Sequence, residues 1–446
     1  MSDLLAARTL MAMSLGFHLI FAMVGMAMPL LMVLAEWRWL KTGQEVYLAV
    51  AKRWAKGTAI FFAIGAVTGT VLSFQLGLLW PKFMEWAGPI IGPAFSIEGF
   101  AFFTEAIFLG IYLYGWRKVN PRAHLAAGGV VALSGIVSGV VVVMANGWMN
   151  TPRGFTMIHG IPSNIDPIAA LLNPSGLFQA PHMILAAFAS AGFAVAGIHA
   201  FLLIRHPGNM FHQKAFNIAF AVGGISAILQ PFSGDLLAQQ VAKLQPLKLA
   251  VFEAQVETQE GAPFRIGGVW NKETETFDHI VEIPFALSLM LHLDPYERVI
   301  GMKEFDKKNW PPINVSRTAF QLMIFLGVIM LSHALWGFFL SYKKGSPGSS
   351  RRFLQATVLA TPVGFIATEA GWVATEVGRQ PWVIAGYLKT ADALTPIPGL
   401  TIPLMLFASL YAFLTVIVVW LMWRHISATP RQFEMPATRP EEEVLT

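Results

Sequence analysis

The stretch IEGFAFFTEAIFLGIYLYGW, from Ile97 to Trp116, decides the fold class. It is almost wholly apolar, and at about 1.5 Å of rise per residue a helix of this length crosses the hydrocarbon core of a bilayer. It also carries two acids, Glu98 and Glu105, which a helix places on one face, roughly 10 Å apart along its axis. An acid in a spanning helix faces a protein interior, a cavity or a cofactor. The pair therefore indicates a site or a proton path, with buried structural partners as the alternative.

The composition extends this conclusion to the whole chain of 446 residues. Hydrophobic residues make up 55% of it and charged residues only 13%, against about 25% charged residues in an average globular domain. The sequence has no cysteine, which excludes disulfides, thiolate metal sites and iron–sulfur clusters. The net charge of +5 is modest and is concentrated in the connections between apolar stretches, so we expect no nucleic acid partner.

Apolar stretches long enough to span a membrane recur along the chain. There are nine, with approximate limits 10–34, 57–80, 97–116, 125–147, 179–204, 214–233, 317–341, 353–375 and 399–423. The expected fold is an all-α integral membrane protein with nine transmembrane helices. Short connections and the C-terminal tail on one side hold 17 Lys and Arg, against 5 on the other. The positive-inside rule then places the N-terminus outside and the C-terminus in the cytoplasm.

The chain divides into four regions on this basis. Residues 1–233 hold helices one to six, and residues 317–427 hold helices seven to nine. Between them lies a charged insertion, 234–316, which is far longer than an ordinary connection and faces outward, so it indicates a functional or folded loop rather than a plain connector. The tail, 428–446, is polar, contains proline and is acidic near its end, and we expect it to be disordered.

Residues unusual in apolar surroundings cluster at one depth. In the expected orientation they lie in the outer half of their spans, beside the long loop: His18, Glu98, Glu105, His182, Met323, Glu369 and Glu376. His and Met are axial ligands of electron-transferring haem, while His or a carboxylate with an open position suits oxygen chemistry. Taken singly, such a histidine more often makes an interhelical hydrogen bond, and a methionine more often packs. A proton-coupled secondary transporter would also use buried acids, but it predicts internal repeats and a site at mid-membrane, and neither is visible.

Several motifs resemble subunit I of the cytochrome bd-type quinol oxidases. They are FQLGLLWPKF at 74–83, IEGFAFFTEAIFLG at 97–110, ANGWMNTPRGF at 145–155, KLAVFEAQVET at 248–258 and EAGWVATEVGRQPW at 369–382. The resemblance covers nearly the whole chain. It implies a multi-pass protein of the bacterial cytoplasmic membrane, an oxidoreductase that oxidises quinol at the outer face and reduces dioxygen to water without copper, building a proton gradient.

The resemblance also implies roles for single residues. His182 and Met323 would ligate a low-spin haem b, and His18 and Glu376 would serve the high-spin haem b and haem d, in an order left open. Glu98 would be a ligand or proton donor at the oxygen-reducing haem. The remaining roles are proton uptake by Glu105 and Ser138, with Lys56 nearer the inside, packing between haems by Trp372, quinol oxidation by Lys248 and Glu253, and propionate pairing at the membrane edge by Arg379, with Gln380 beside it.

Some features remain open under this resemblance. Gln321 stands where the family often has an arginine, which predicts a lower potential for the low-spin haem, and the insertion is of the short type. The third haem is either d or another b, and the substrate is ubiquinol or menaquinol. The implied partners are a second membrane subunit, subunit II, and a single-span accessory peptide.

Overall fold

The computed structural model describes residues 1–428 and is mostly helical. The predicted disordered tail lies, from residue 429 onward, outside the described residues. In the described part, nine helices are long and apolar enough to cross a membrane, as predicted. They are α1 (Asp3–Thr42), α2 (Glu45–Leu79), α3 (Pro81–Tyr114), α4 (Pro121–Asn150), α6 (Pro174–Arg205), α7 (Met210–Leu244), α10 (Ile313–Lys344), the pair α11 (Arg351–Ala360) and α12 (Val363–Val377), and α13 (Thr401–Ser427).

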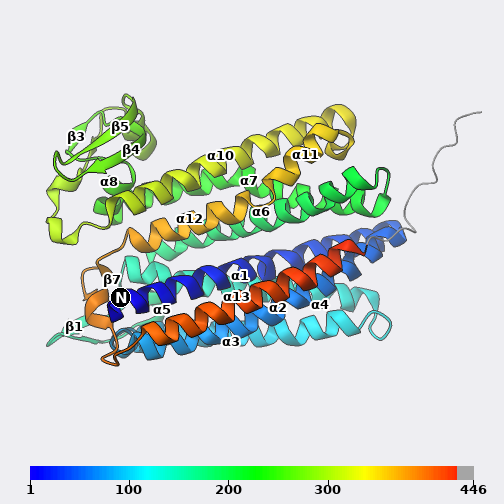
Figure 1. The fold of residues 1–446 in the computed structure, drawn as a ribbon, viewed down its shortest axis with the longest axis horizontal. Coiled ribbons are helices and arrows are strands. Elements are labelled where there is room, and N and C mark those ends of the chain that lie inside the picture. Colours follow the sequence, from blue (N-terminus) through cyan, green and yellow to red (C-terminus); the bar gives the residue numbers. More distant parts are fainter. Residues whose placement is uncertain (429–446) are drawn as a thin grey trace, which may run out of the picture.

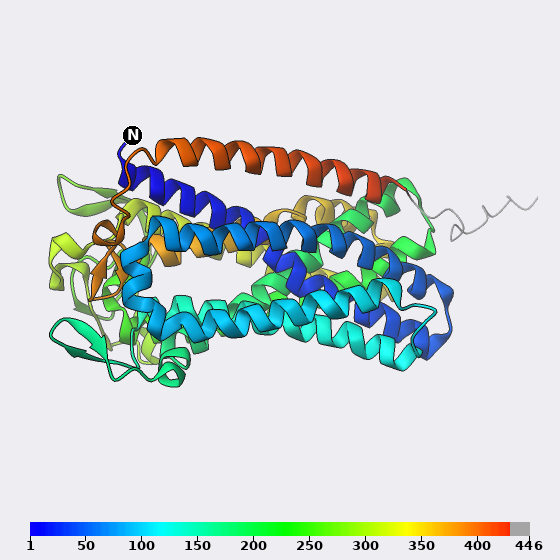
Figure 2. The ribbon, with the colours of Figure 1, turned by 90° about the horizontal axis from the view of Figure 1, so that it is seen from below.

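The spanning helices form two groups that run side by side (Figure 1). One group holds α1 to α4 and α13, and the other holds α6, α7 and α10 to α12; α4 and α1 pack against α6 where the groups meet. The N-terminus and the segment between α7 and α10 lie at the same end of the bundle, which we call the loop end. The opposite end, where α13 finishes, is the tail end, and Figure 2 shows the same arrangement from below.

The helices differ from the predicted spans at proline. The third span was expected to begin after Pro93, but α3 continues through Pro89 and Pro93 from Pro81. Each proline removes one backbone donor, which a long spanning helix tolerates. The eighth span is two helices rather than one, because α11 ends at Ala360 and α12 begins after Pro362.

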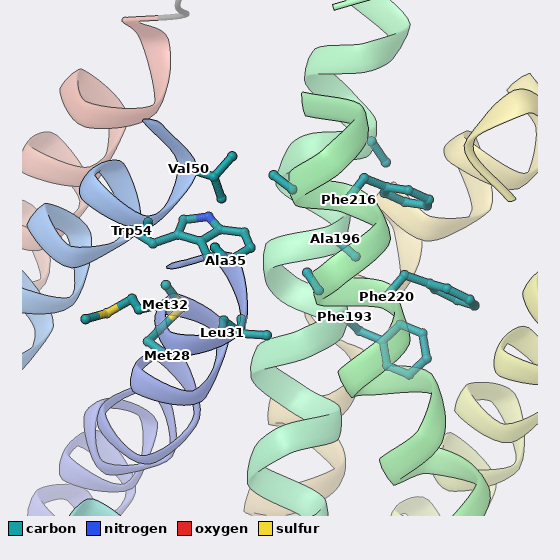
Figure 3. Close-up of a cluster of buried hydrophobic side chains, with 14 of the residues drawn as sticks. Met28, Leu31, Met32, Ala35, Val50, Trp54, Phe193, Ala196, Phe216 and Phe220 are labelled. Atoms are coloured by element: carbon teal, nitrogen blue, oxygen red, sulfur yellow. The ribbon is translucent and has the colours of Figure 1, made fainter. Parts of the chain in front are cut away.

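A tightly packed apolar core fixes the tail half of the bundle. Figure 3 shows Met28, Leu31 and Met32 of α1 facing Val50 and Trp54 of α2, with phenylalanines of α6 and α7 beyond them. At the α6–α7 crossing the backbones approach so closely that a Cβ on Gly192 would lie 2.5 Å from the Cα of Gly223. This close approach holds α6 and α7 in a fixed register.

Smaller elements cover the loop end. They are α5 (Pro167–Leu171), α8 (Pro246–Phe252), α9 (Ala286–His292), η1 (Met302–Glu304), η2 (Lys307–Asn309), η4 (Thr390–Ala393) and four antiparallel strand pairs: β1 (Thr156–Ile158) with β2 (Ile161–Ser163), β3 (Gln259–Glu260) with β6 (Arg298–Val299), β4 (Phe264–Asn271) with β5 (Thr276–Ile283), and β7 (Trp382–Ile384) with β8 (Leu388–Lys389). At the tail end, η3 (Pro347–Ser349) precedes α11. Because α7 continues to Leu244 and α10 begins at Ile313, the insertion outside the long helices is 245–312.

Candidate functional site

The two acids of α3 face α4 and α1. The Ser138 hydroxyl donates to Glu98 at 3.4 Å. One turn further from the loop end, a Cβ on Gly135 would lie 3.6 Å from both carboxylate oxygens of Glu105, whose side chain is buried. The Glu105 carboxylate therefore packs directly against the α4 backbone at Gly135. The structure thus brings Glu98, Glu105 and Ser138 together along one helix interface.

His18 lies on α1 against α2. Its Nδ1 is 2.9 Å from the hydroxyl of Thr68, and a Cβ on Gly69 would come within 3.1 Å of the ring. Among residues 1–428 no hydrogen bond reaches Nε2 of this ring. Glu369 of α12 approaches the same helix, because its Oε2 would lie 3.2 Å from a Cβ on Gly16, and its other oxygen is buried without a partner in the described chain.

His182 and Met323 lie in the second helix group. The His182 Nδ1 is 3.0 Å from the hydroxyl of Ser233 on α7, and the amide nitrogen of Gln230 is 3.1 Å from Nε2. Met323 of α10 points at α12, where a Cβ on Gly371 would lie 2.7 Å from its sulfur. Only a glycine at 371 permits this approach.

A buried polar cluster joins α4, α8 and α12 at the loop end. The Asn146 amide and the Arg379 guanidinium each donate to the Glu376 carboxylate at 2.5 Å. Lys248 donates to Asn150 at 2.5 Å. Burial, together with the charge of Arg379, lowers the pKa of Lys248 to about 7, while Glu376 opposes that shift. Two further donors of Arg379, Nε and Nη1, are buried without a partner in the part of the chain described.

Glu253 follows directly after α8. Its charged neighbours are Arg317 and Arg265, whereas Lys248 contacts Asn150. The Glu253 side chain is buried, and its Oε2 has no hydrogen-bond partner among the described residues. Burial raises the pKa of Glu253 to about 7, although the positive charges of Arg317 and Arg265 act in the opposite direction. A carboxyl group with this pKa exchanges a proton readily near neutral pH.

Arg317 attaches the insertion to α10. It is 1% exposed, and it donates to the carbonyl groups of Gly267 and Arg265 at 2.9 Å and to that of Phe252. Gln321, one turn along α10, donates to the Arg265 carbonyl at 3.1 Å and accepts from the Gly267 amide at 3.0 Å. Gln321 is therefore engaged by the β4–β5 hairpin.

Two of the predicted residues stand apart from these groups. Gln380 accepts a hydrogen bond from Thr390 at 2.9 Å, within the loop that follows α12. Trp372 is half-buried on α12, between Glu369 and Glu376 in sequence.

The sequence reasoning missed several polar partners. They are Thr68, Asn146, Asn150, Gln230, Ser233 and Arg317. The signal available for four of them was spacing, since Asn146 and Asn150 are one turn apart near the end of a spanning helix, as are Gln230 and Ser233. Their importance depends on which helix lies opposite, and spacing does not reveal that.

Comparison with known proteins gives consistent matches over nearly the full chain. The family model for "Cytochrome bd terminal oxidase subunit I" matches residues 6–430. The "Putative cytochrome bd menaquinol oxidase subunit I" of Bacillus subtilis (strain 168) is 34% identical over 435 residues, covering 96% of this chain and 98% of the relative. The "Cytochrome bd ubiquinol oxidase subunit 1" of the same organism is 30% identical over 440 residues, with 96% and 94% covered. The solved bd oxidase of Geobacillus thermodenitrificans has 35% identity and a TM-score of 0.91, over 96% of this chain and 99% of that one.

Proposed function

This multi-pass membrane chain belongs to the cytochrome bd terminal oxidase subunit I family, and we propose that it is the haem-bearing subunit of a copper-free respiratory oxidase. In this proposal it oxidises quinol at the outer face of the bacterial cytoplasmic membrane and reduces dioxygen to water, with haem b and either haem d or a further haem b. The N-terminus lies outside and the C-terminus in the cytoplasm, as the distribution of Lys and Arg supports. The loop end is then the outer end.

The observation that carries the proposal is how the histidines are held at the loop end. A metal-ligating histidine usually binds the metal through one nitrogen and hydrogen bonds through the other. His18 and His182 each contact a hydroxyl through Nδ1, at 2.9 and 3.0 Å. Nε2 of His18 is thereby left for iron. Nε2 of His182 is contacted by the Gln230 amide, which must turn away for the ring to bind iron.

The other proposed haem contacts also fit the residues present. Met323 presents its sulfur to the side-chain-free surface of Gly371, and it would hold the low-spin haem together with His182. Glu376 would serve one active-site haem, as His18 would serve the other, and one of its oxygens would then have to leave Asn146 or Arg379. The partnerless buried donors of Arg379 suit a carboxylate such as a haem propionate. Bound haem supplies electron transfer and dioxygen reduction.

The chain's own residues move the protons. Glu253, with its pKa raised to about 7, accepts a proton from quinol at the loop end as a general base. Lys248, which donates to Asn150, positions the adjoining segment of α8. At the oxygen-reducing site Glu98 and Ser138 form a hydrogen-bonded pair, and Glu105, about two turns deeper, delivers protons from the cytoplasmic side. Trp372 fills apolar space between the haems, and Gln380 fixes the loop after α12.

The partners follow from the family. We propose that the chain works with a second membrane subunit, subunit II, and a single-span accessory peptide. Its substrates are dioxygen and either menaquinol or ubiquinol, the quinols after which the two Bacillus subtilis relatives are named.

Dioxygen consumption by the purified complex tests this function. With ubiquinol or menaquinol as donor, the wild type consumes dioxygen, and Glu98→Gln and Glu253→Gln reduce the rate at least about 100-fold, the lower limit of the range for a general acid or base. Glu273→Gln, an exposed acid in the same insertion, is the matched control and keeps the wild-type rate. Absence of quinol-dependent dioxygen consumption by the complete wild-type complex would overturn the proposal.

A further inference from the structure

A basic cavity opens at the tail end, away from the loop-end groups described above. It has a volume of about 470 Å³ and lies between α2 and α13. Five of its lining residues are basic: Lys52, Arg53, Lys56, Arg424 and His425. No acid lines the cavity within residues 1–428. The positive charges therefore face one another without a carboxylate from the described chain to neutralise them, an arrangement that favours an anionic ligand.

Two reciprocal hydrogen bonds fix the wall of this cavity. The Arg53 guanidinium donates to the carbonyl of His425, and the His425 Nε2 donates to the carbonyl of Arg53 at 3.1 Å. The imidazole packs against Gly57, where a Cβ would lie 3.6 Å from Nε2, an ordinary van der Waals contact. These hydrogen bonds attach the end of α13 to α2. Lys52, Lys56 and Arg424 supply the remaining positive charge that faces the cavity.

Aromatic residues place the cavity at the level of lipid headgroups. Lys52 lies over the ring of Trp116 at 5.3 Å, and Arg424 lies over that of Trp420 at 5.7 Å. Trp420 is 56% exposed on the outer surface of α13, and Trp423 is 69% exposed. Tryptophan and basic residues together mark the boundary between hydrocarbon and water in spanning helices.

We propose that this cavity binds the phosphate-bearing headgroup of an anionic phospholipid. Phosphate accepts hydrogen bonds from several cations at once, and basic pockets between spanning helices on the cytoplasmic side take such headgroups. A lipid fits better than a free phosphate ion because half of the lining is apolar, from Ala49, Ile60, Phe211, Leu421 and Ala428. These side chains suit the glycerol and the first carbons of the acyl chains. The inference rests on the membrane-spanning fold and on the proposed orientation, in which the tail end is cytoplasmic, and not on the oxidase activity.

Lipid binding by the purified, delipidated complex tests the proposal. The triple variant Lys52→Gln, Lys56→Gln and Arg424→Gln removes three charges and keeps the hydrogen bonds between Arg53 and His425. Its matched control is Lys343→Gln, Lys344→Gln and Arg351→Gln, which removes three exposed charges at the same end of the bundle. Native mass spectrometry counts the phosphatidylglycerol molecules retained, with phosphatidylcholine as the neutral lipid.

The expected result is one tightly held phosphatidylglycerol in the wild type and in the control variant. The cavity variant should bind this lipid about 100-fold more weakly, or about 5-fold for each basic residue removed. Equal retention by the two triple variants would overturn the proposal. It would also be overturned if inorganic phosphate bound as tightly as phosphatidylglycerol, or if the lipid bound only after residues 429–446 were deleted, since the chain itself would then be the occupant.

Discussion

Removal of the Arg317 side chain tests how the insertion is held on the helices. Arg317→Met keeps the length and the apolar part of this buried residue, but it removes the donors to the carbonyl groups of Phe252, Arg265 and Gly267. A hydrogen bond from a charged group contributes about 1.5–3 kcal/mol. Once the segment opens, water hydrogen bonds to the released carbonyl groups, so the net loss is smaller than the sum of the separate hydrogen bonds. We expect the free energy that docks the segment 245–312 on the helices to fall by about 3–5 kcal/mol.

Limited proteolysis measures this change directly. A loss of about 3 kcal/mol raises the population of the opened segment, and hence its cleavage rate, about 100-fold. The control is Arg298→Met, whose side chain is 63% exposed and pairs with Glu304 at 3.6 Å. An exposed pair contributes about 1 kcal/mol at most, so cleavage should rise less than about 5-fold. Equal cleavage of the two variants would refute the idea that Arg317 anchors the insertion. Arg317→Lys should fall between them, because it keeps the charge but loses the planar fork.

Two further predictions concern proton transfer and the proposed methionine ligand. Because the pKa of Glu253 is raised to about 7, the residue is protonated below that pH and able to accept a proton above it. Initial rates of quinol oxidation should therefore rise with pH through about 7 in the wild type, and this rise should vanish in Glu253→Gln; a rise that persists would contradict the assignment. Gly371→Ala places a Cβ 2.7 Å from the Met323 sulfur, so optical spectra should show a changed or lost low-spin haem. Gly327→Ala, on the same helix as Met323 and with open space around it, should leave the spectrum unchanged, and equal spectra for both variants would count against this ligand.

The sequence predicted the helices better than it predicted their contacts. Hydrophobic length fixes a spanning helix, and the nine predicted spans correspond to nine long apolar helices in the described chain. Two predicted helix limits were wrong. Pro93 was treated as the start of the third span, but α3 continues through it, and the break before Val363 in the eighth span was not predicted. A proline in a long buried helix removes one donor, and whether the helix continues depends on the packing around it.

The partners of the candidate site residues were not predictable from the sequence, and their depth was predictable only in part. Hydropathy and charge predicted that the acids and histidines lie in the loop-end half of their spans. Glu105 departs from this prediction, because α3 begins at Pro81 and Glu105 lies nearer to its other end, Tyr114. That Glu376 would meet Asn146 of α4 depends on which helices are neighbours. Lys248 and Glu253 lie only five residues apart in one motif, yet Lys248 faces Asn150 while Glu253 faces Arg317. The end of α8 lies between them, so helical periodicity no longer relates their directions.

The reduced-minus-oxidised optical spectrum of the purified complex shows whether this chain carries haem and through which residues. We expect haem bands in the wild type and a selective loss of the low-spin haem b in both His182→Ala and Met323→Leu. A far-red band would identify haem d as the third haem. A wild-type complex without haem bands, or two variants that keep the low-spin haem unchanged, would contradict the account.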